Sequence, residues 1–163
     1  MASVSATVPA LALQGDEGMP MLGLGTWKAT PGEVGRAVRE AVALGYRHID
    51  CAPIYGNEAE AGEALEDCLR QGIVRREELW ITSKLWNDAH APEDVAPALA
   101  RTLGDLRLES LDLYLIHWPV ALRRGAPLPP AAADILAPEA IPLSTTWRAM
   151  EAARASGRCR HIG

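Results

Sequence analysis

The chain has no phenylalanine and few aromatic residues of any kind: five tryptophans and three tyrosines among 163 residues. It also lacks blocks of like charge, and its formal net charge is -5 at pH 7. This composition argues against the strongly basic surfaces that bind nucleic acid or anionic membranes. Residues 1–13 are small and apolar, but they carry no basic segment and are too short to span a bilayer. We therefore expect a cytoplasmic protein without membrane or nucleic-acid partners.

Cysteine is scarce as well. Cys51, Cys68 and Cys159 are an odd number and have no metal-ligand spacing. They predict neither a disulfide framework nor a metal site, and they fit a reducing compartment. With 48% hydrophobic and 23% charged residues, the chain has the balance of an ordinary globular protein and the length for one domain with its own core.

Apolar runs typical of strands recur along the chain. They begin near Leu22, Tyr46, Leu79 and Leu111, and the chain stops inside another that begins at Arg158. Helical patterns fill the gaps, and a strand alternating with a helix at about 30-residue intervals is the βα unit of a parallel sheet. A (β/α)₈ barrel, or TIM barrel, needs eight such units and about 250 residues. Four units and the start of a fifth predict an α/β fold that is the N-terminal half of such a barrel, with residues 1–163 as one domain.

Capping signals predict where the four helices begin. Thr30, followed by Pro31 and Glu33, has the pattern of a capping box, and Asn57 is the expected cap of the second helix. The third helix is expected to open at residues 91–92 and the fourth to run over residues 144–156.

Two segments interrupt this rhythm. Residues 8–21 hold a turn signal at 14–18 between short apolar stretches, which predicts a β-hairpin. Residues 119–143 are rich in proline and alanine and follow directly after His117. Loops of this length are usually functional or disordered, and we expect this one to lie on the substrate side of the domain.

Four polar residues close the predicted strands or lie just past them: Asp50, Tyr55, Lys84 and His117. Because the carboxyl ends of parallel strands meet on one rim, these side chains are expected to gather there. An acid, a phenol, an amine and an imidazole together predict a proton-transfer site. Each residue alone also has an ordinary interpretation, as a strand-end cap, a packing residue, a solvated lysine or a structural histidine, but their shared position favours the site.

Other reactive side chains are expected to be structural. His48, His90 and His161 fall within a strand, in a loop and near the terminus. Cys51 follows Asp50 and so points to the opposite face of the strand, which argues against a nucleophile. The glycines of GLGTW at 23–27 do not form a GxGxxG motif before a helix, so a Rossmann fold is not indicated.

The residues around Asp50 resemble the signature of a known family. GYRHIDCA at 45–52, YGNE at 55–58 and Gly62 are similar to the pattern of the aldo-keto reductases. The resemblance continues through GLGTW, TSKLW and LDLYLIHWP and so covers the chain from Met19 onward. The residues that fill these motifs are most similar to those of the aldehyde reductase and aldose reductase branch.

This resemblance implies a (β/α)₈ barrel that binds NADPH across its rim and reduces aldehydes and ketones to alcohols. It implies that Tyr55 is the proton donor, that Lys84 and Asp50 tune it, and that His117 positions the carbonyl. The hairpin would close the bottom of the barrel, and the complete protein would be a monomer. Residues expected to face the nicotinamide ribose are Gly25, Thr26, Trp27 and Asp50. The groups that bind the rest of the cofactor come from later strands in this family, so the choice between NADPH and NADH is not readable from these residues.

The chemistry of carbonyl reduction explains these residue types. A tyrosine has a pKa near 10, and a neighbouring ammonium such as that of Lys84 favours its phenolate form. Asp50 would hold Lys84 charged and aimed. His117, as a neutral donor, can hydrogen-bond the carbonyl oxygen.

The tryptophans support a substrate pocket on the same rim. Trp27, Trp86 and Trp118 each follow a strand end, and with Ile54 they would form an apolar wall around the substrate, to which His117 also belongs. Aromatic and apolar carbonyl compounds are therefore expected to bind better than charged ones. Trp80 and Trp147 lie within a strand and a helix and are expected to be packing residues.

Two other functions stay open on the sequence alone. A cofactor-binding regulatory subunit could use the same fold, and a truncated chain could be unable to bind cofactor. Half a barrel would expose two sheet edges, so such a chain should aggregate, pair with another half, or belong to a longer polypeptide. The last of these is the expectation we favour.

Overall fold

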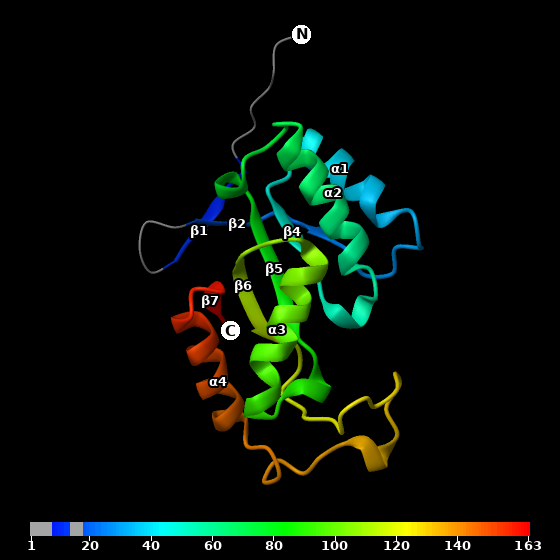
Figure 1. The fold of residues 1–163 in the computed structure, drawn as a ribbon, viewed down its shortest axis with the longest axis vertical. Helices are drawn as coiled ribbons and strands as arrows, with labels where there is room; N and C mark the ends of the chain where they lie inside the picture. The colour runs from blue at the N-terminus through cyan, green and yellow to red at the C-terminus, as the bar shows by residue number, and fades with distance from the viewer. Residues whose placement is uncertain (1–7, 14–17) are drawn as a thin grey trace.

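The computed structural model describes residues 8–13 and 18–163, and its largest element is a parallel β-sheet (Figure 1). The sheet has the order β3-β4-β5-β6-β7, so neighbours in space are also neighbours in the chain. All of its pairings are parallel. The strands are β3 Leu24–Gly25, β4 His48–Asp50, β5 Trp80–Leu85, β6 Leu111–Ile116 and β7 Cys159–Ile162.

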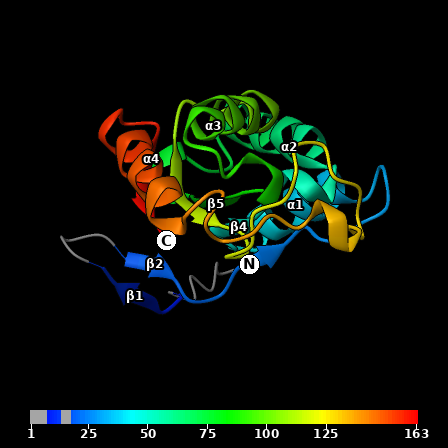
Figure 2. The same cartoon turned by 90° about the horizontal axis from the view of Figure 1, so that it is seen from below.

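A helix connects each strand to the next. Figure 2 shows the four helices in an arc around one side of the strands, as in part of a barrel wall. This sequential parallel order, with all crossover helices on the outer side, is the arrangement of a (β/α)₈ barrel. The predicted half-barrel is therefore confirmed. The helices are α1 Val34–Ala43, α2 Glu58–Arg70, α3 Pro92–Leu106 and α4 Leu143–Ala155.

The hydrophobic core lies between the strands and the helices. Strand residues such as Ile49 and Ile81 are fully buried there, together with helix residues such as Leu65 and Leu99. In α3 the buried positions recur every three or four residues, as an amphipathic helix requires. They are Val95, Ala98, Leu99, Thr102, Leu103 and Leu106.

Gly62 allows α2 and α3 to approach closely. A Cβ atom at this position would lie 2.2 Å from the carbonyl oxygen of Asp105, which is too close for any side chain. The glycine is therefore a packing requirement.

The beginnings of two helices differ from the prediction. The first helix begins at Val34, not at Thr30, because the intervening turn contains Gly32 with φ +87°. The Thr30 hydroxyl donates to the Glu33 carboxylate at 2.5 Å, within that turn. Asn57 does occupy the N-cap position of α2, but its side chain makes no capping hydrogen bond. The predicted starts of α3 and α4 are correct to within one residue.

The predicted hairpin is present. β1 Ala10–Ala12 pairs antiparallel with β2 Gly18–Pro20; of its expected turn, residues 14–17 lie outside the described residues. Nδ1 of His48 in β4 lies 3.0 Å from the carbonyl oxygen of Pro20, and Nε2 lies 2.9 Å from the Thr82 hydroxyl. His48 thus ties the hairpin to the sheet, in agreement with a structural role.

The 119–143 segment connects β6 to α4 and ends at the first residue of that helix. Leu122 and Ile135 form an antiparallel bridge within it, and the 3₁₀ turn η4 Ala132–Asp134 precedes Ile135. The backbone N–H of Leu122 also donates to the carbonyl oxygen of Asn87 at 2.9 Å. The loop is therefore attached to the segment that follows β5.

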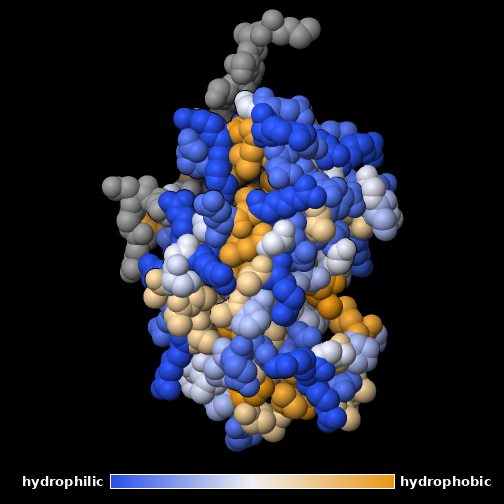
Figure 3. All heavy atoms as spheres, in the orientation of Figure 1, coloured by the Kyte–Doolittle hydropathy of each residue, from blue (hydrophilic) through white to orange (hydrophobic). Residues whose placement is uncertain are grey.

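The surface carries both hydrophobic and hydrophilic residues. In the orientation of Figure 3, an apolar strip runs down the middle of the molecule near the position of β5 in Figure 1, and hydrophilic side chains flank it. In the part of the chain that the structure describes, no helix combines the length and the apolar character needed to cross a membrane. Trp80 is buried as expected. Trp147 is 37% exposed and its indole N–H donates to Glu151, so the described residues do not bury it as the predicted packing role requires.

Candidate active site

Asp50 and Lys84 form an ion pair at the carboxyl ends of β4 and β5. Nζ of Lys84 lies 2.8 Å from Oδ1 and 2.9 Å from Oδ2 of Asp50. It also donates to the carbonyl oxygen of Cys51 at 2.8 Å. The Lys84 side chain is only 12% exposed, and an ammonium with so little access to water needs an anionic partner. Asp50 supplies that charge.

Tyr55 extends this chain of contacts. It ends the 3₁₀ turn η1 Pro53–Tyr55, which follows β4 directly. Its hydroxyl oxygen lies 3.3 Å from Nζ of Lys84, and the ammonium also lies 5.1 Å from the centre of the Tyr55 ring. Asp50, Lys84 and Tyr55 are thus linked in series, with the ammonium between the carboxylate and the phenol oxygen.

His117 completes the group. It follows β6, and its backbone N–H donates to the carbonyl oxygen of Leu85 at 3.1 Å, which prolongs the pairing of β5 with β6. Its imidazole meets the ring of Tyr55 edge to face at 5.9 Å. Burial, and then the nearby Lys84 ammonium, lower the pKa of His117 below its ordinary 6.5, while Asp50 acts in the opposite direction. The imidazole is therefore neutral at pH 7, as suits a hydrogen-bond donor.

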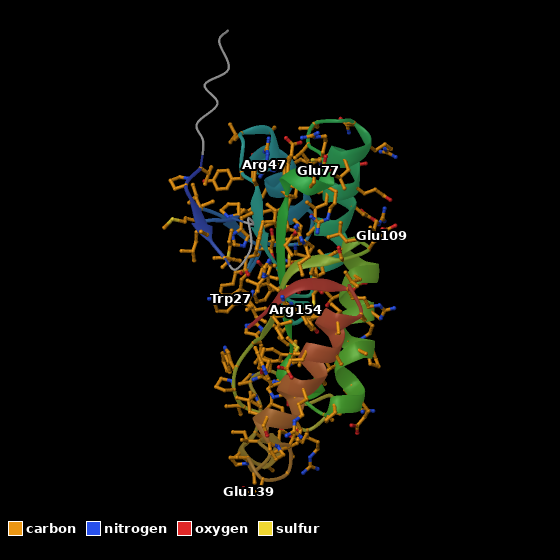
Figure 4. All side chains as sticks on the ribbon, turned by 90° about the vertical axis from the view of Figure 1, so that its left-hand side faces the viewer. Trp27, Arg47, Glu77, Glu109, Glu139 and Arg154 are labelled. Atoms are coloured by element: carbon orange, nitrogen blue, oxygen red, sulfur yellow. The ribbon has the colours of Figure 1, made fainter. Side chains whose placement is uncertain are left out.

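Three tryptophans surround these polar groups. The Trp86 ring lies 5.0 Å from the His117 ring and 6.0 Å from that of Trp118. Trp27 stacks on Tyr55 at 6.1 Å, and Figure 4 shows it on the side of the molecule away from α3 and α4. Trp86 is buried, whereas Trp27 and Trp118 are 65% and 53% exposed. Two large apolar surfaces therefore flank Tyr55 and His117 and are open to a ligand.

Ile54 lies near one of these tryptophans, Trp86. It is half-buried, and together with Trp86 it lines a cavity of about 240 Å³ that reaches α3 at Ala98 and Thr102. Tyr55 and His117 do not line this cavity within the described part of the chain. The structure thus brings Ile54 to Trp86 at this cavity, and its contact with substrate stays a prediction.

The residues expected to face a cofactor divide into two kinds. Gly25 is exposed, and a Cβ atom built there would have no neighbour within 4 Å; Trp27 and the Asp50 carboxylate, 36% exposed, are accessible as well. An open glycine allows close approach, and a carboxylate accepts hydrogen bonds from ribose hydroxyl groups. The chemistry of these residues is suited to a ribose, and their contact with the nicotinamide ribose stays a prediction. The Thr26 side chain is buried instead, and its hydroxyl donates to the carbonyl oxygen of Asp50 at 3.1 Å.

Asn57 is a site-supporting residue that sequence reasoning assigned only as a helix cap. Its amide nitrogen donates to the carbonyl oxygen of Thr26 at 2.8 Å, and the residue is buried. This contact joins the segment after β3 to the start of α2, and so fixes Trp27 near Tyr55. The position of Asn57 in the YGNE motif indicated that this residue could belong to the site. Its partner Thr26 lies 31 residues away, so no local pattern could identify the contact.

The Cys51 thiol is completely buried. Burial is the main reason that the pKa of its thiol rises to about 12, so the thiolate is not formed at neutral pH. All three cysteines are buried and unpaired with one another. The burial of Cys51 agrees with the expectation of a structural role, which stays a prediction.

Comparison with known proteins identifies the family. The model of the aldo/keto reductase family matches residues 18–163. The chain belongs to this family. An aldo/keto reductase of Synechocystis is 54% identical over 151 residues, which are 93% of this chain and 46% of that protein. The bovine aldo-keto reductase family 1 member A1 is 55% identical over 147 residues, 89% of this chain and 45% of the bovine protein.

Solved structures of aldo-keto reductases have the same fold. The aldose reductase of Schistosoma japonicum superimposes with a TM-score of 0.87 at 46% identity, over 95% of this chain and 52% of that one. An aldo-keto reductase of Bombyx mori, solved in complex with NADP, gives 0.85 at 38% identity, over 98% of this chain and 50% of that one. The chain thus spans about half the length of the relatives it matches.

Proposed function

We propose that this chain carries the catalytic group of an NADPH-dependent reductase of aldehydes and ketones. The observation that supports it best is the series Asp50–Lys84–Tyr55 beside a neutral His117, on the rim formed by the carboxyl ends of the strands. The family relationship and the NADP complex of the Bombyx mori relative point the same way.

Each residue has one role in this proposal. His117 donates a hydrogen bond to the substrate carbonyl oxygen and holds it near Tyr55. Tyr55 gives its hydroxyl proton to that oxygen as the alcohol forms. The Lys84 ammonium stabilises the phenolate that is left, and Asp50 keeps the ammonium in place.

NADPH, when bound, supplies the hydride that adds to the carbonyl carbon. Gly25, Trp27 and Asp50 would hold its nicotinamide end, and Thr26 would support them through its bond to the Asp50 backbone. The stacked Trp27 and the exposed Trp118 would exclude water from an aromatic substrate.

We also propose that turnover requires the remaining strands of the barrel, supplied by a longer polypeptide. Two observations support this. In the described sheet, β3 and β7 each have a neighbour on one side alone, and the relatives are about twice as long as this chain.

The test is a titration of tryptophan fluorescence with NADPH, followed by NADPH oxidation with an aromatic aldehyde. The expected result is oxidation by this chain joined to a complementary half-barrel, and no oxidation by the 163-residue chain alone. Saturable binding without oxidation in the completed barrel would contradict the catalytic role and favour a regulatory subunit. Oxidation by the chain alone would contradict the need for further strands.

A further inference from the structure

A second polar cluster lies directly behind the catalytic rim, on the helix side of the sheet. Successive strand residues point to opposite faces, so Ser83 faces away from its neighbour Lys84, and Cys51 away from Asp50. Ser83 and Cys51 are completely buried. The chemistry proposed above uses the front face and leaves these groups without a role.

Glu58 is the centre of this cluster. It is the first residue of α2 and is 3% exposed. The Ser83 hydroxyl donates to its Oε1 at 2.5 Å, and the Thr102 hydroxyl donates to its Oε2 at 3.1 Å. One buried carboxyl therefore joins α2, β5 and α3.

The same two chain segments are in contact on both faces of the sheet. On the front, the Tyr55 hydroxyl meets Lys84 at 3.3 Å. On the back, Glu58, three residues after Tyr55, meets Ser83, the residue before Lys84. The same two segments, 55–58 and 83–84, are thus joined by one contact on each side of β5. A shift of the rear contact would move the two front groups relative to each other.

The Glu58 carboxyl is also electrostatically coupled to the site. Burial raises its pKa to about 7, while the bonds from Ser83 and Thr102 oppose that rise; Asp105 of α3 raises it further and Lys84 of β5 lowers it. Its charge in turn contributes to the raised pKa values of Cys51, after β4, and of Tyr114, in β6.

We propose that Glu58 is a positioning residue, which sets the distance between Lys84 and Tyr55 by holding Ser83 from behind the sheet. The inference rests on the proposed function for its catalytic meaning, but its structural part does not. If the Glu58 carboxyl only joined α2 to α3, its hydrogen bond with Thr102 would be the important one, and loss of the bond with Ser83 would not move Lys84. Ser83→Ala and Thr102→Val therefore separate the two roles, because each removes one of the two hydrogen bonds.

Lys84 can be observed directly, since the chain contains one other lysine, the exposed Lys28. With ¹³C-labelled lysine in the 163-residue chain, the Lys84 Cε signal should move in Ser83→Ala and stay in place in Thr102→Val, with Lys28 as the internal reference. In the unsubstituted chain the same signal should show a step near pH 7 as Glu58 ionises. Glu58→Gln should abolish that step.

Turnover gives the second readout. In the completed barrel, Ser83→Ala should lower kcat by roughly tenfold to a hundredfold and leave NADPH affinity unchanged, since small misplacements of catalytic groups have effects of this size. An unmoved Lys84 signal in Ser83→Ala, equal movement in Thr102→Val, or a step that survives Glu58→Gln would overturn the proposal. The predicted NMR changes in a protein without any reductase activity would keep Glu58 as a positioning residue and overturn the proposed function instead.

Discussion

Nζ of Lys84 lies within 3 Å of both carboxylate oxygens of Asp50 and 3.3 Å from the hydroxyl oxygen of Tyr55. Lys84 and Asp50 come from adjacent strands, and Tyr55 comes from the turn that follows β4. The ammonium therefore contacts both the acid and the phenol.

Tyr55→Phe removes the hydroxyl group and keeps the ring. We expect turnover to fall by at least about a hundredfold, since general acid catalysis contributes that much or more, while NADPH affinity stays within about threefold of the wild type because phenylalanine still stacks on Trp27. NADPH oxidation and fluorescence titration of the completed barrel measure the two effects. Tyr46→Phe, before β4, is the matched control and should change neither. Near-normal turnover in Tyr55→Phe would show that another group donates the proton.

Asp50→Asn leaves the Lys84 ammonium without its anionic partner. We expect the free energy of unfolding to fall by about 1–3 kcal/mol, less than for a fully buried pair because Asp50 is 36% exposed. Urea denaturation of the chain measures this. Asp67→Asn breaks two surface pairs, with Arg70 of α2, which is 72% exposed, and with Arg39 of α1, which is 47% exposed, and should cost no more than about 1 kcal/mol. Equal losses in the two variants would mean that the Lys84 pair is no more important than a surface pair.

The stability contributed by Glu58 should decrease as the pH rises. Its pKa is near 7 in the folded chain and near 4.5 ordinarily, so the folded state keeps a proton that the unfolded state releases between these values. The contribution is therefore complete below about pH 4.5 and is lost as the pH rises through 7, a change of roughly 2–3 kcal/mol.

Glu58→Gln cannot ionise and isolates this effect. The difference in free energy of unfolding between the wild type and Glu58→Gln should shift in favour of the variant between pH 5 and pH 8. Urea denaturation at both pH values tests it. A difference that stays constant with pH would mean that the carboxyl does not titrate in this range.

The His117 imidazole should become half protonated at a lower pH than an exposed histidine does. Burial and the Lys84 ammonium both disfavour its charged form. Two-dimensional ¹H–¹⁵N spectra of the ring nitrogens, recorded from pH 5 to pH 8, should show that the pKa of His117 lies below 6.5. In Lys84→Met the midpoint should move upward. A midpoint above 6.5 in the wild type would contradict the proposed neutral donor.

The 119–143 loop should affect the binding of bulky aldehydes more than that of small ones. Arg124 pairs with Asp94, and the backbone N–H of Gly125 donates to Asp88 at 3.2 Å, so the loop is attached beside the segment that carries Trp86. Arg124→Ala should raise KM for a bulky aromatic aldehyde about threefold, since an exposed ion pair contributes at most about 1 kcal/mol. KM for a small aliphatic aldehyde should stay unchanged. Arg70→Ala, on α2, is the control, and a KM effect that is the same for both aldehydes would separate the loop from specificity.

Much of the architecture could be predicted because it depends on local patterns. The alternation of apolar runs with helical periodicity predicted the parallel half-barrel, and the position of Asp50, Lys84 and His117 at strand ends predicted their meeting on one rim. The start of α1 could not be predicted, because a glycine with positive φ interrupted a sequence that otherwise resembles a capping box. The partial exposure of Trp147 was not predicted either, because the local sequence pattern does not show whether another element of the fold packs over this part of α4.

The sequence by itself determined the strand and helix order, the family, and which residue types occupy the rim, because these follow from short-range periodicity and from motifs of a few residues. The tertiary structure alone decided the partners of the buried and half-buried polar groups: Asn57 with Thr26, Glu58 with Ser83 and Thr102, and His48 with Pro20 and Thr82. These contacts join residues 25 to 44 positions apart. Their choice depends on which helix packs behind which strand, and a buried polar group takes the partner that this packing places within hydrogen-bond distance.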